Sequence, residues 1–84
     1  MLDDPNDRTQ RAAQAVATYI ARHPMAADNA EGIAQVWLPA MGVEVPQPSL
    51  LGALELLVSQ RVLRRVVLAD DSVIYRAAQA SNQA

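Results

Sequence analysis

The chain has 84 residues, 51% of them hydrophobic and only 4% aromatic, which allows one small domain with an aliphatic core. It contains no Cys, so a disulfide framework, a thiolate metal site and a thiol nucleophile are excluded. All seven basic residues are Arg, and the net charge is −2, whereas nucleic-acid modules typically carry a marked basic excess. No apolar stretch approaches the ~20 residues of a membrane span. We expect a single cytoplasmic domain over residues 1–84, with flexible tails at 1–4 and 79–84 and no contact with a membrane.

The first predicted element is a helix over about residues 5–22. Asp4 followed by Pro5 is typical of an N-cap with proline at the first helical position. An apolar stripe follows at helical spacing: Ala13, Val16, Ala17 and Ile20. The helix is expected to end at His23, because the residue before Pro24 is disfavoured in the α region.

A second helix is predicted from the pair Asp28 and Glu31, which forms a possible capping box. One face of this helix is apolar and comprises Ala30, Ile33, Ala34, Trp37 and Leu38. Pro39 is expected to end it, and Gly32 within it suggests close packing against another backbone. Residues 39–48 hold three prolines and a glycine, which predicts a turn or extended segment with a possible short β-bridge at Val43 and Val45.

The third helix is predicted over about residues 49–60. Its apolar residues fall within one arc, so they should form a core stripe: Leu50, Leu51, Leu54, Leu57 and Val58. Two strands with alternating apolar residues follow, Val62–Leu68 and Val73–Ala77, joined by a turn at 69–72. The expected fold is therefore mainly α with a small β-hairpin.

This order of elements resembles the winged helix-turn-helix family over most of residues 8–77. The resemblance is carried by the leucines of the third helix, by Val62 with Leu63, and by the closing segment 73–76. It implies a three-helix domain with a C-terminal wing, a scaffold that most often binds DNA. The chain departs from the family pattern at residues 39–48, because this link is much longer than the usual turn of ~3–4 residues between the paired helices.

The side of the third helix opposite its core stripe is the first candidate binding surface. It is predicted to expose Gly52, Ala53, Glu55, Leu56, Ser59 and Gln60. A helix that contacts bases needs Arg, Lys, Asn or Gln on this side, whereas this one offers one Gln and an acid that phosphate would repel. A leucine among small residues suits docking to another protein, with Gly52, Ala53, Leu56, Ser59 and Gln60 as the surface. Alternatively, Leu56 is a single exposed leucine or packs beneath the wing or the 39–48 link.

The second candidate surface consists of the four arginines at the start of the wing and along it: Arg61, Arg64, Arg65 and Arg76. They suit contact with phosphates, or with carboxylates at the rim of a protein interface. The alternative is a solvated edge that prevents strand-to-strand aggregation, with Asp70 and Asp71 as nearby counter-charges.

Residues with potential chemistry have simpler structural interpretations. His23 is the sole histidine, and without Cys or a second His it lacks the partners of a zinc site or a general base. Trp37, Tyr19 and Tyr75 suit core packing, and no glycine-rich phosphate loop is present. We therefore expect no enzyme activity, catalytic residue, cofactor, metal or small-molecule substrate.

These observations favour a small non-enzymatic module that binds another protein or a second copy of itself through the open face of the third helix and the wing. The alternative is a DNA-binding transcriptional regulator that contacts phosphates through the wing arginines. The family resemblance favours the alternative. The uncharged face of the third helix and the acidic balance of the chain favour the first interpretation.

Overall fold

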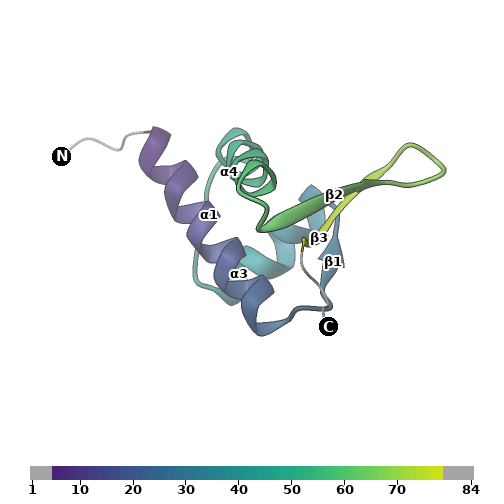
Figure 1. The fold of residues 1–84 in the computed structure, drawn as a ribbon. Coiled ribbons are helices and arrows are strands. Elements are labelled where there is room, and N and C mark those ends of the chain that lie inside the picture. Colours follow the sequence, from purple (N-terminus) through teal and green to yellow (C-terminus); the bar gives the residue numbers. More distant parts are fainter. Residues whose placement is uncertain (1–4, 79–84) are drawn as a thin grey trace.

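The computed structural model describes residues 5–78, in which helices pack together and a β-hairpin projects from one side (Figure 1). Helix α1 (Pro5–Arg22) comes first, followed by the short strand β1 (Ala27–Asp28). A segmented helix comes next, made of α2 (Ala30–Gly32), the π-helical η1 (Ile33–Trp37) and α3 (Leu38–Ala40). Helix α4 (Gln47–Ser59) leads into strands β2 (Leu63–Val67) and β3 (Val73–Ala77). The predicted fold class, helices followed by an antiparallel hairpin, is confirmed.

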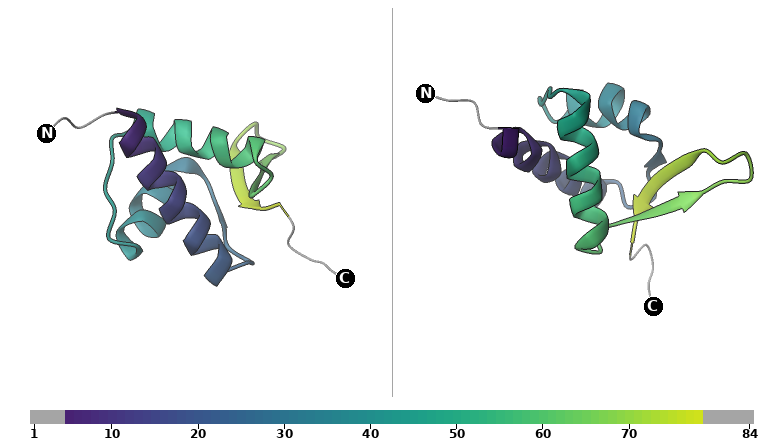
Figure 2. Two further views of the ribbon diagram at one scale, coloured as in Figure 1. Left: turned by 60° about the vertical axis from the view of Figure 1, so that its left-hand side comes forward. Right: turned by 90° about the horizontal axis from the view of Figure 1, so that it is seen from above.

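The three strands form one antiparallel sheet in the order β1-β3-β2. Its central strand β3 pairs with β1 through Asp28 and Tyr75, and with all five residues of β2. The hairpin extends away from the helices (right view of Figure 2). This topology is consistent with a winged-helix-like domain. The sequence did not indicate β1, because two residues are too few to show an alternating pattern.

The core lies where α1, the segmented helix, α4 and the start of β2 meet. Its largest fully buried side chains are aliphatic: Val16, Ile33, Leu38, Leu50, Leu54 and Leu63. Trp37 and Tyr75 are buried with them, and Tyr19 stacks on Trp37 with ring centroids 4.8 Å apart. The predicted core roles of Trp37 and Tyr75 are therefore confirmed, while Tyr19 is only partly buried against the core.

The predicted core stripe of α4 is wrong at two positions, one assigned to the core and one assigned to the open face. Leu51 was expected in the core but is 41% exposed, whereas Ala53 was expected on the open face and is 0% exposed. The stripe is rotated because α4 packs closely along α1, which presents the small buried residues Ala12 and Ala13. A small residue on α4 lets the two helices approach, so Ala53 faces inward although larger residues lie nearby.

The segmented helix also differs from the prediction. Its N-cap is Asn29, whose side chain accepts a hydrogen bond from the N–H of Gly32 at 2.7 Å, and Asp28 belongs to β1 instead. A Cβ at position 32 would meet the carboxylate of Asp28, which is the movable end of a side chain and not the backbone that we expected. The helix continues through Pro39 to Ala40, since the wider π turn removes the clash between a proline ring and a preceding carbonyl.

The link to α4 is extended, as predicted, but residues 43–46 form no β-bridge. Pro46 is the N-cap residue of α4, and Pro48 lies within its first turn, where the missing N–H has no cost. The helix therefore begins two residues earlier than the sequence indicated.

Candidate interaction surface

A tight turn fixes where the wing leaves α4. The N–H of Val62 donates to the carbonyl of Leu57 at 2.9 Å, and the N–H of Arg61 donates to that of Val58 at 3.1 Å. This is a Schellman pairing, in which the residue after the C-cap takes the left-handed conformation usually given to Gly. Here it is Arg61, with φ of 64°. A charged side chain is therefore held at the helix end in a backbone conformation that is unfavourable for it.

The strand register sorts the wing arginines onto two faces. Arg64 lies directly opposite Arg76, and Arg65 lies directly opposite Tyr75. Arg64 and Arg76 thus share one face of the hairpin, where like charges in opposed positions repel each other. Arg65 lies on the other face, which is turned toward α4.

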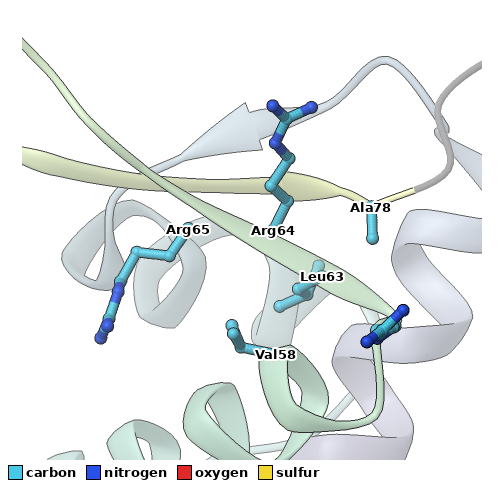
Figure 3. A pocket seen from close by; sticks show the side chains of 6 residues that line it. Val58, Leu63, Arg64, Arg65 and Ala78 are labelled. Carbon is cyan, nitrogen blue, oxygen red and sulfur yellow. The ribbon is translucent and has the colours of Figure 1, made fainter.

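Arg61, Arg64 and Arg65 contribute to the lining of an open hollow of about 520 Å³ between the end of α4 and the wing. Its apolar part is formed by Val58, Leu63 and Ala78. Figure 3 shows Arg64 and Arg65 leaving β2 in different directions, with Leu63 and Val58 on the side of the strand away from Arg64. The hollow therefore combines an apolar floor with cationic side chains around it, an arrangement suited to a ligand that is both apolar and anionic.

The charges around this hollow are only partly compensated. Arg65 lies 3.9 Å from Glu55 of α4, and these side chains are 50% and 73% exposed, so the pair contributes less than about 1 kcal/mol. Within residues 5–78, no carboxylate forms an ion pair with Arg61, Arg64 or Arg76. The expected counter-charge Asp70 instead accepts hydrogen bonds from the hydroxyl and the N–H of Ser72, at 2.6 and 3.1 Å.

These hydrogen bonds order the turn at the tip of the wing. The Ser72 hydroxyl, followed by the Ser72 N–H, holds the pKa of the Asp70 carboxyl below its ordinary value of 3.8. Asp71 has φ of 71°, so this tight turn uses a left-handed residue that is not Gly. Beside the turn, the exposed apolar side chains are Val67 and Leu68.

The surface predicted on the third helix is not a continuous open face. Gly52, Ser59 and Gln60 are exposed, but Ala53 is buried and Leu56 is half-buried against the core. Leu56 lines a groove of about 170 Å³ with residues of α1 and with Val62, just before the wing, so it is not the single exposed leucine of the other alternative. Gly52 faces α1 as well, because a Cβ there would lie 3.6 Å from the methyl group of Thr9.

The side of α4 that faces solvent carries Leu51, Glu55 and Ser59 at helical spacing. We call these three residues the outer face of α4. Sequence reasoning missed Leu51 because it falls within the same helical arc as the core leucines. A usable signal was its neighbour Glu55, four residues along the same side of the helix, whose charge marks the solvent-facing direction.

The described part of the chain was searched for metal-binding clusters and for membrane-spanning helices. No cluster of at least three His, Asp or Glu side chains suited to a metal ion occurs in residues 5–78. His23 is exposed and contacts the ring of Tyr19, with centroids 4.5 Å apart. None of the helices described is long and apolar enough to cross a membrane.

Searches of protein-family models, of curated proteins and of solved structures gave no match to this chain.

Proposed function

We propose that this chain is a non-enzymatic protein-binding module with a winged-helix-like fold. The binding surface consists of the outer face of α4 and the arginines of the wing. The observation that carries the proposal is the chemistry of α4 itself, which contains no Lys or Arg and presents Leu51 and Glu55 to solvent. The corresponding helix in a DNA-binding domain needs cations or amides at these positions.

The outer face of α4 is better suited to a protein partner. Glu55 repels phosphate and is paired with Arg65, so these charges partly cancel at the centre of the surface. Leu51 offers an exposed apolar group to an incoming side chain. Burial of a leucine, with arginines at the margin, is typical of protein interfaces.

The backbone of the wing supports a binding role for the hairpin. Within residues 5–78, the two non-glycine residues with positive φ are Arg61 and Asp71, and both flank β2. Arg64 and Arg76 are opposed like charges in the same hairpin. Departures from locally favourable structure are expected where a surface serves function and not stability.

DNA binding is the second candidate, and the exposed arginines favour it. If all four wing arginines contacted phosphates, the affinity would fall with salt with a log–log slope of about −3.6. Such binding would be weak and independent of sequence, because α4 supplies no cation to contact bases.

A titration with random duplex DNA separates the two candidates. We expect binding weaker than about 100 μM at physiological salt, as for a small number of phosphate contacts. Sub-micromolar binding that is lost in the double variant Arg64→Ala, Arg65→Ala would overturn the proposal.

A photo-crosslinking residue placed at position 51 supplies the positive test. We expect crosslinks to a discrete protein partner or to a second copy of the chain. To test the role of Leu51 itself, the crosslinking residue is placed at position 59 instead. In that protein, the substitution Leu51→Glu should abolish the crosslinks. The matched control is Val36→Glu, because Val36 is also exposed but belongs to η1. Equal loss with both variants would contradict a specific role of the outer face.

A further inference from the structure

Strand β2 forms one edge of the sheet, since the strand order is β1-β3-β2. The N–H of Ala78 donates to the carbonyl of Val62 at 3.1 Å, and the N–H of Leu68 donates to that of Ser72 at 2.8 Å. In an antiparallel pair, hydrogen-bonded and non-hydrogen-bonded positions alternate. Arg64 and Val66 are therefore the residues of β2 whose backbone groups bond to β3.

The intervening residues Leu63, Arg65 and Val67 direct their backbone N–H and C=O groups to the opposite side, away from β3. Within residues 5–78, no other strand pairs with β2 on that side. Three successive residues of β2 also line the hollow described above: Leu63, Arg64 and Arg65. An open backbone edge and a cationic, apolar-floored hollow thus lie along the same strand.

We propose that this edge binds an extended acidic segment of a partner protein, which adds to the sheet as a further strand beside β2. Backbone hydrogen bonds to Leu63, Arg65 and Val67 hold the segment, and an apolar side chain of the segment enters the hollow against Val58 and Leu63. Its carboxylates meet the surrounding arginines. This inference rests on the proposed function, because it assumes that the partner is a protein.

Charge complementarity selects this occupant. Arg61, Arg64 and Arg65 have a single carboxylate, that of Glu55, within ion-pair distance in the described structure. Pairing of β2 with the β2 strand of a second copy would bring two arginine-containing strands together without adding any carboxylate from β2, so the like charges would repel. The phosphates of a nucleic acid could pair with the arginines. They would not supply the alternating N–H donors and C=O acceptors that the open edge of β2 requires.

The first experiment titrates the whole protein with a dye-labelled peptide in which Glu and Val alternate. A matched peptide carries N-methyl groups on its valines, so it has the same charge but cannot donate those backbone hydrogen bonds. We expect binding to the first peptide and at least roughly tenfold weaker binding to the second. Equal binding to both would overturn strand addition, as would failure of the first peptide to bind at millimolar concentration.

Amide hydrogen exchange tests the register directly. On addition of the alternating peptide, the amides of Leu63, Arg65 and Val67 should exchange more slowly. Those of Arg64 and Val66 should change little, because they already bond to β3. Protection that is uniform along β2, or absent from it, would contradict the proposed edge.

Two matched variants separate the backbone from the charge. Val67→Pro removes one outward N–H without altering any charge, and proline is tolerated at such an edge position. We expect roughly three- to tenfold weaker peptide binding than in Val67→Thr, which keeps the N–H. The double variant Arg61→Gln, Arg64→Gln should weaken binding by roughly tenfold or more. Unchanged affinity in either case would overturn the proposal.

Failure of this inference is distinguishable from failure of the proposed function. Crosslinking from position 51 reports on α4 independently of the edge of β2. Retained crosslinking without peptide binding overturns the edge proposal alone. Displacement of the peptide by an equimolar amount of random duplex DNA would assign the arginines to phosphate and overturn both.

Discussion

The helical body and the wing are stabilised in different ways. In the body, α1 and α4 bury small and aliphatic side chains against each other and against the segmented helix. The wing buries only Leu63 and Tyr75, and most of its other side chains are half-buried or exposed. It also holds the opposed arginines and both left-handed non-glycine residues. The body therefore supplies stability, whereas the wing tolerates unfavourable local features and is the better place for a binding surface.

The largest expected effect contrasts two leucines on the same helix. Leu54→Ala should destabilise the protein by about 2–5 kcal/mol, because Leu54 is fully buried and a cavity would remain. Leu51→Ala should change the free energy of unfolding by less than about 0.5 kcal/mol, because Leu51 is exposed. Urea unfolding of both variants measures the difference. Equal losses would mean that the outer face of α4 is not open.

Ala53→Leu tests how closely α1 and α4 approach. Extra methyl groups at a fully buried position should cost about 1–3 kcal/mol, since neighbouring side chains must move. Ser59→Leu on the outer face is the control and should be nearly neutral in thermal unfolding. A neutral Ala53→Leu variant would restore the open face that the sequence suggested.

Arg61→Gly tests the strained junction between the body and the wing. Glycine adopts positive φ without a steric penalty, so we expect a gain of about 0.5–1 kcal/mol in the free energy of unfolding. Arg64→Gly also removes a charge but lies within β2, where glycine should destabilise by a similar amount. Chemical unfolding of the two variants should therefore give opposite signs. A loss of stability in both would contradict the left-handed junction.

Gly52→Ala tests how much space separates α4 from Thr9 of α1. The new Cβ would lie 3.6 Å from Thr9, an ordinary contact, so the higher helix propensity of Ala should stabilise by about 0.5–1 kcal/mol. A rise in the midpoint of thermal unfolding checks this. A clear fall would show that the helices are closer than described.

The smallest effect concerns the tip of the wing. Ser72→Ala removes the hydroxyl that most lowers the pKa of Asp70, so this pKa should rise toward 3.8. Because the folded-state pKa is lowered, the stabilisation is present above the ordinary value and is lost as the pH falls through the folded-state pKa. An NMR titration of the Asp70 carboxyl measures the shift, with Ser59→Ala as a control that should leave it unchanged.

The regular elements were predictable because their signals are local. Helix α1 and strand β3 have the predicted bounds, since a proline marks one end of the helix and alternation marks the strand. The segmented helix was harder. Asn29 replaces Asp28 as its cap because Asp28 is recruited to the sheet by β3, a partner nearly fifty residues away. The π turn that accommodates Pro39 leaves no comparable pattern in the sequence.

By itself, the sequence determined the order of helices and hairpin, the aliphatic core and the position of the arginines beyond the end of α4. These follow from periodicity, caps and composition, which act over a few residues. Only the tertiary structure decided that Ala53 faces inward and Leu51 outward, because that depends on how closely α1 approaches. The strand order likewise decided that β2 is an open edge, and the strand register decided that Arg64 opposes Arg76. Both depend on pairing between separate segments of the chain.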